Sequence, residues 1–166
     1  MIKFCLIFSF LVLNDVPPDL IHMRNLYEKL DKNEKVTREL DQFAKTNTTV
    51  PSSIRNAYLA VTYMALSQYQ NNPVSKLKGF NEGKNRLEKA IQTDTSSLEM
   101  RYMRLSIQQH APGILGYTSH ISKDTRFLIT HLNSLKKSDP DLFVRIYTYL
   151  LIKCKLSNED KRLING

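Results

Sequence analysis

Glycine, proline and cysteine are scarce in this chain. Its 166 residues include five glycines, six prolines and two cysteines. So few turn-forming residues argue against a β-sandwich, a β-barrel or a collagen-like chain. Cys5 lies inside an apolar run, so it does not form a disulfide framework with Cys154, which remains a lone thiol. No CxxC pair or zinc-binding set of cysteines is present, which argues against redox chemistry.

Catalytic signatures are also missing. The sequence has no GxSxG, HExxH, GxGxxG, Walker-type glycine loop or EF-hand loop. The four histidines are scattered, and only His120 has a carboxylate within helical reach, that of Asp124. We therefore expect no catalytic residues, no metal and no cofactor. An enzyme whose site is assembled from residues distant in the sequence stays an alternative.

The longest apolar run lies at the start of the chain. Residues 4–13 are almost purely apolar, follow Lys3 and precede a polar, proline-containing stretch. As a helix this run would measure about 15 Å, which is half of a bilayer core and too short to span it. The layout predicts a signal peptide or an apolar N-terminal segment over 1–16, and hence an exported protein, periplasmic or secreted. A cytoplasmic protein in which this run is the first helix, and a membrane-tethering segment, are the alternatives.

Positive charge is concentrated in residues 101–166. The formal net charge is +8; residues 1–100 carry 13 basic and 11 acidic side chains, and residues 101–166 carry 11 and 5. Such a field attracts polyanions, acidic protein surfaces and anionic membrane surfaces without choosing among them. No run of five basic residues and no aromatic RNA-binding motif accompanies it.

Apolar residues recur at helical spacing almost everywhere beyond residue 17. We expect an all-α fold of about seven or eight helices, with Pro73 ending the third helix and 74–79 forming a polar connector. The expected helices cover 18–30, 36–44, 54–69, 80–91, 96–109, 122–135, 140–154 and a short segment after 157.

The helix expected around 98–107 is apolar on two faces. Stepping 100° per residue separates the apolar side chains into two groups on opposite sides. The groups are Leu98, Tyr102 and Leu105, and Met100, Met103 and Ile107. A helix of this kind is covered on both sides, as an inner helix of a stack of helix pairs would be.

The chain also repeats weakly with a period near 45 residues. Residues 83–91 followed by 98–102 resemble the end of one tetratricopeptide repeat and the start of the next, with small residues at Gly83 and Ala90 and a large apolar one at Leu87. Thr95 replaces the usual proline, and the period is longer than in that family. The resemblance implies stacked antiparallel helical hairpins in a right-handed superhelix, with 17–166 as a single helical-repeat domain.

One edge of the helix at 98–107 is the candidate binding surface. Arg101 and Arg104 lie one turn apart and can fork onto a carboxylate or phosphate, and Gln108 extends the row. If the preceding helix turns Lys84, Asn85 or Glu88 toward the same groove, the result is a concave polar patch of the kind that stacked helices use to bind peptides. The alternative is that these arginines bind acids of adjacent helices and hold the stack together.

Two aromatic side chains and a loop complete the candidates. Tyr58 and Tyr102 would contact a partner if they are exposed, and Ile114, Leu115 and Tyr117 are either tucked under the fold or free for a partner. The sequence thus predicts a non-enzymatic, exported scaffold that binds an unknown protein or peptide. A basic C-terminal surface that binds nucleic acid or anionic lipid is the alternative, and export would argue against nucleic acid.

Overall fold

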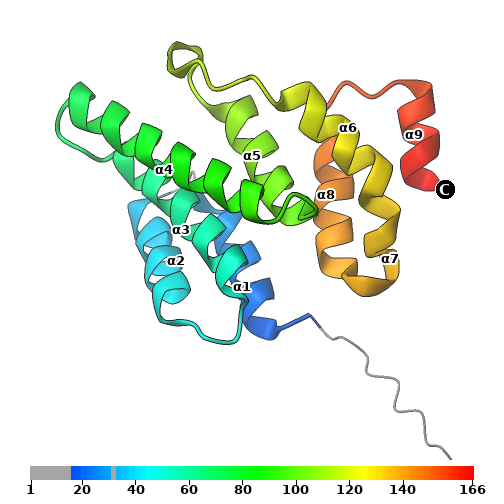
Figure 1. The fold of residues 1–166 in the computed structure, drawn as a ribbon, viewed down its shortest axis with the longest axis horizontal. Coiled ribbons are helices and arrows are strands. Elements are labelled where there is room, and N and C mark those ends of the chain that lie inside the picture. Colours follow the sequence, from blue (N-terminus) through cyan, green and yellow to red (C-terminus); the bar gives the residue numbers. More distant parts are fainter. Residues whose placement is uncertain (1–15, 31–32) are drawn as a thin grey trace, which may run out of the picture.

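The computed structural model describes residues 16–30 and 33–166 and shows a chain built of helices (Figure 1). The predicted signal peptide or apolar segment falls on residues that lie almost wholly outside this described part. In order, the elements are α1 (Pro18–Tyr27), α2 (Glu34–Thr46), α3 (Ser52–Ser67), α4 (Pro73–Thr93), α5 (Leu98–His110), η2 (Gly113–Leu115), α6 (Ile121–His131), η3 (Leu132–Ser134), α7 (Leu135–Ser138), α8 (Pro140–Lys153) and α9 (Asn158–Asn165).

The all-α prediction is confirmed. The described residues contain no strand, and eight of their α-helices are eight residues or longer. Side chains cap most of these helices by accepting a backbone N–H, as Asp139 does from Leu142 and Ser157 does from Asp160. Such caps satisfy donors that the first turn of a helix leaves unpaired, and each contributes about 1 kcal/mol.

The connector expected at 74–79 is wrong. Pro73 begins α4, because Asn72 accepts a hydrogen bond from the backbone N–H of Ser75 at 2.8 Å and a proline fits the first turn of a helix. The third helix ends at Ser67, and α4 then runs for 21 residues alongside α3.

Two hydrophobic cores lie on opposite sides of α5. Met100 and Met103 are fully buried against α1–α4, whereas Tyr102 and Leu105 belong to a second core with α6–α9. In Figure 1, α5 accordingly stands between the group α1–α4 and the group α6–α9. The expected two-sided coverage of this helix is therefore what the structure shows.

None of the helices in the described part of the chain combines the length and the apolar character that crossing a membrane requires.

Candidate functional site

The predicted arginines lie inside the protein. Arg104 donates from Nε and Nη2 to the two carboxylate oxygens of Asp124 on α6 at 2.6 and 2.7 Å, and Arg101 donates from Nη1 to the same carboxylate at 3.1 Å. Asp124 is completely buried, and Arg101 and Arg104 are 8% and 4% exposed. One carboxylate thus joins two guanidinium groups of α5 to α6.

The remaining donors of these arginines are also bound within the chain. Arg104 donates to Glu88 of α4 at 2.5 Å, and Tyr117 donates to the other oxygen of the same carboxylate at 2.6 Å. Arg101 donates twice to the backbone carbonyl of Thr95 and lies 4.0 Å from the ring centre of Phe127. This geometry fits the alternative in which the pair holds the helices together.

The other predicted residues do not gather into one exposed site. Gln108 is buried, and its Oε1 accepts a hydrogen bond from the backbone of His120 at 3.2 Å. Lys84 is partly exposed and lies over the ring of Tyr117 at 5.7 Å. In the loop before α6, Ile114 is 95% exposed while Tyr117 is buried, so only the former is free for a partner.

Tyr58 and Tyr102 are buried rather than exposed, at 1% and 8% of their surface. Burial and the neighbouring Glu99 raise the pKa of Tyr58 well above its usual value, and its hydroxyl donates to Glu99 at 2.6 Å. Burial also raises the pKa of Tyr102. Tyr58 is therefore not exposed to a partner, as the predicted contact requires. Tyr102 reaches the surface only at the groove that is described below.

A second buried charge cluster surrounds Arg24 of α1. Its guanidinium group donates to Glu99 of α5 and to Asp139 and Asp141 at the start of α8, over distances of 2.7–2.9 Å. Burial alone lowers the pKa of Arg24, but the hydrogen bonds to Glu99 and Asp139 outweigh it and raise the pKa above its usual range. Arg24 thereby ties the first helix to α5 and α8.

The cluster continues to the surface through Arg145. This side chain donates from Nε and Nη2 to Asp141 at 2.9 and 3.0 Å, and its Nη1 lies 2.6 Å from Glu28 just after α1. Burial favours the neutral acid at Asp141, but the bonds from Arg145 and Arg24 outweigh it and lower the pKa of the carboxyl. The surface end of the network is therefore ionised and fixed in place.

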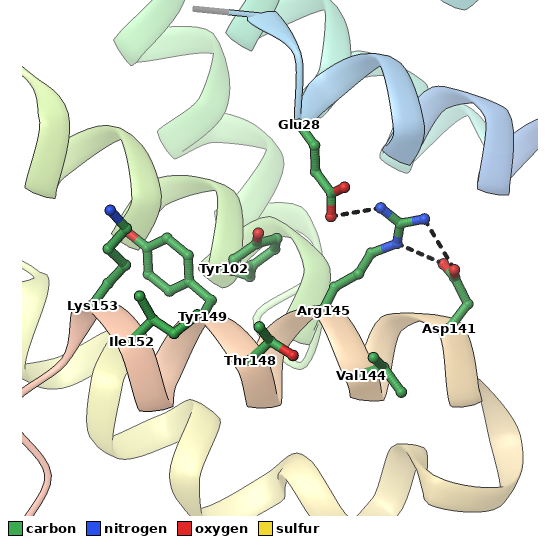
Figure 2. Close-up of a pocket in the computed structure, with 9 residues that line it drawn as sticks. All are labelled: Glu28, Tyr102, Asp141, Val144, Arg145, Thr148, Tyr149, Ile152 and Lys153. Atoms are coloured by element: carbon green, nitrogen blue, oxygen red, sulfur yellow. Dashed lines mark hydrogen bonds and ion pairs between the residues drawn. The ribbon is translucent and has the colours of Figure 1, made fainter.

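An open groove of about 430 Å³ adjoins this network, between α8, Tyr102 of α5 and Glu28 just after α1. Figure 2 shows the ion pairs of Arg145 near one end and Lys153 near the other, with aromatic and apolar side chains between them. The side chains from α8 are Asp141, Val144, Arg145, Thr148, Tyr149, Ile152 and Lys153, and the others are Glu28 and Tyr102.

Of the predicted residues, only Tyr102 lines this groove. The sequence carried a signal for the rest, because Val144, Thr148 and Ile152 recur at intervals of four along a helix whose core face is Leu142, Ile146 and Leu150. Leu142, Ile146 and Leu150 already form the face of α8 that packs on the core. A second row of partly apolar side chains on the same helix therefore indicates a surface that contacts no other part of the fold. Val144 and Ile152 are indeed 58% and 69% exposed.

Within residues 16–30 and 33–166, no three histidine, cysteine, aspartate or glutamate side chains converge in a way that could hold a metal ion. Comparisons of the chain with known protein families, with curated proteins and with solved structures found no match.

Proposed function

We propose that this protein is a non-enzymatic helical scaffold that binds a segment of another protein in the groove of α8. The observation that supports this is the groove itself: an open space of about 430 Å³ whose walls combine aromatic rings, exposed apolar side chains and charges. Sites for small ligands and short segments have this mixture and this size.

The rigidity of the walls supports the same proposal. Arg24 and Arg145 fix the ends of α1, α5 and α8 relative to one another through hydrogen bonds of 2.6–3.0 Å. A site that is formed before the ligand arrives loses less conformational entropy on binding. The stacked helical hairpins, which resemble tetratricopeptide repeats, suit this role, because such stacks commonly bind peptides along one face.

A displayed library of random peptides tests the proposal. We expect selected peptides to bind the wild-type protein and to lose at least about tenfold in affinity to Thr148→Trp, because the indole occupies the groove. Thr148 is exposed, so the variant should fold. Thr130→Trp is the matched control, since this residue is also exposed but lies on α6 outside the groove. Failure to select any peptide, or equal binding to both variants, would contradict the proposal.

The basic C-terminal surface supports a second candidate, binding of a polyanion. Lys137, Lys155, Lys161 and Arg162 are exposed, and none of them pairs with a carboxylate in the part of the chain that the structure describes. Binding to DNA or to anionic vesicles that weakens steeply between low and moderate salt would favour this candidate. Charge reversal at Lys161 and Arg162 should then abolish it, while Thr148→Trp should not change it.

We propose export as the location, on the evidence of residues 1–16 alone. The apolar run after Lys3 supports it. N-terminal sequencing of the protein from its native host tests it: a new N-terminus near residue 16 is the expected result, and an intact Met1 on the cytoplasmic protein would overturn it.

A further inference from the structure

The two ends of the groove carry opposite charge. At the end near the start of α8, two guanidinium groups, those of Arg24 and Arg145, face four carboxylates, and within the described residues these carboxylates form no other ion pair. The carboxylates are those of Glu28, Glu99, Asp139 and Asp141. Each carboxylate pairs with an arginine, but the network as a whole has a net charge of about −2.

The excess negative charge faces the groove. Glu28 and Asp141 line the groove, with side chains that are 46% and 26% exposed, whereas that of Glu99 is only 6% exposed. The positive end of the dipole of α8 offsets about half an elementary charge there. About one and a half negative charges remain at this end, where a cationic group can approach from solvent.

Lys153 gives the opposite end a positive charge. It is the last residue of α8, it is exposed, and no carboxylate in residues 16–30 or 33–166 pairs with it. The negative end of the helix dipole offsets about half of this charge, which leaves the end positive. Lys153 lies twelve positions after Asp141, a distance of about 18 Å along α8.

The middle of the groove is apolar. Val144 and Ile152 are largely exposed at its rim, and the rings of Tyr102 and Tyr149 form its wall. The hydroxyl of Tyr149 donates to Gln109 at 2.6 Å, so this part of the wall presents its ring more than its polar group. An apolar side chain of a ligand would remove these surfaces from water.

We infer that the groove takes an extended segment of a partner protein that carries a basic side chain and an acidic side chain about five residues apart, with apolar residues between them. This inference rests on the proposed function and specifies its ligand. An extended chain rises about 3.3 Å per residue, so five residues cover the distance between the charged ends. A volume of about 430 Å³ holds a few residues of extended chain and not a helix of three turns.

The charge pattern favours this segment over a polyanion. A nucleic acid or an anionic headgroup would be attracted by Lys153 but repelled by Glu28 and Asp141, and like charges brought together cost free energy. A segment with one charge of each sign matches both ends. The inference fixes the spacing of the two charges, and the experiment compares their two orders.

A series of synthetic hexapeptides with the same apolar middle tests the inference at low ionic strength. The end residues are arginine and glutamate in both orders, two arginines, two glutamates, or two glutamines. We expect one of the two mixed peptides to bind about twofold to fivefold more tightly than the peptide with two arginines and the peptide with two glutamates, which lies within the range for exposed ion pairs. Lys153→Glu should shift the preference to the peptide with two arginines, and Glu28→Lys should shift it to the peptide with two glutamates.

Two variants with the same charge changes elsewhere serve as controls. Lys89→Glu and Glu39→Lys alter exposed residues outside the groove and should leave the preference unchanged. One outcome is binding that does not depend on the end charges of the peptides and yet takes place in the groove, which loss of binding to Thr148→Trp would show. This result would overturn the inference and leave the proposed function standing. Tightest binding by the peptide with two glutamates would overturn it in favour of the polyanion candidate. Absence of any peptide binding would overturn both.

Discussion

Arg24 of α1 and Glu99 of α5 form two parallel hydrogen bonds of 2.9 Å in the interior, although 75 positions separate them in the sequence. The pair is 2% and 5% exposed. Tyr58 of α3 also donates to the carboxylate of Glu99, so α1, α3 and α5 meet at one buried charge. Asp139 and Asp141 bring α8 to the same guanidinium group.

Removal of Arg24 should destabilise the protein strongly. Arg24→Met leaves Glu99 and Asp139 buried or half-buried without their cation, and loss of one partner from a buried pair costs about 3–5 kcal/mol. Urea unfolding at neutral pH measures the change. Arg38→Met removes an arginine from an exposed pair with Glu34 and should cost less than about 1 kcal/mol. Equal losses in the two variants would show that the buried cluster does not stabilise the fold.

Asp124 should be nearly as important as Arg24. Asp124→Asn leaves the guanidinium groups of Arg101 and Arg104 in the interior with only Glu88 to balance them. We expect a loss of about 3 kcal/mol or more in the free energy of unfolding. Glu34→Gln, in an exposed pair, is the control and should change stability by less than about 1 kcal/mol. If Asp124→Asn unfolds at the same denaturant concentration as the wild type, the arginines are not held by this charge, and a role in binding a partner regains support.

The sequence revealed the arginines but not their partner. Arg101 and Arg104 are adjacent along one helix, and this follows from the helical repeat alone. Asp124 lies 23 and 20 residues further on, beyond an irregular loop, so its position depends on how α6 packs against α5. The burial of α5 on two sides was predictable, because the helix has apolar side chains on two opposite faces and each face packs in a different core.

The groove was missed for a related reason. Its walls are formed by Glu28, Tyr102 and residues of α8. The spacing of apolar residues within one helix does not indicate which other helices pack beside it, so the groove could not be predicted from the sequence. Pro73 was misread because a proline is compatible with the end and with the first turn of a helix. Asn72 distinguishes the two positions, because an asparagine directly before a proline is typical of the start of a helix, and its side chain caps α4.

Gly83 should tolerate no side chain. A Cβ atom built there would lie 2.7 Å from the backbone oxygen of Ala60 and 2.8 Å from the backbone nitrogen of Met64, because α3 and α4 pack closely at this point. Gly83→Ala should therefore cost about 1–3 kcal/mol, although alanine is the better helix former. Gly113→Ala is the matched control, since no atom lies within 4 Å of its Cβ position, and it should be close to neutral. Thermal unfolding of both variants decides the matter, and a stabilised Gly83→Ala protein would contradict the packing.

Stability should fall steeply in alkali. Burial is the largest cause that raises the pKa of Tyr58, Tyr102 and Tyr117. In the unfolded chain a tyrosine loses its proton near pH 10, while in the folded protein these three keep theirs, so each stabilises the fold fully below about pH 10 and loses this effect as the pH rises above it. Each contributes a slope of about 1.4 kcal/mol per pH unit, so the three together contribute about 4 kcal/mol per pH unit.

Single substitutions separate the contributions to this slope. Tyr58→Phe and Tyr102→Phe should each reduce the slope above about pH 10 by about 1.4 kcal/mol per pH unit, because phenylalanine has no proton to lose. At neutral pH the two should differ: Tyr58→Phe also removes the 2.6 Å hydrogen bond to the buried Glu99 and should cost about 1–3 kcal/mol. Urea unfolding from about pH 8 to about pH 11 measures both quantities. A slope that neither substitution alters would mean that other groups cause the alkaline transition and that these tyrosines ionise within the folded protein.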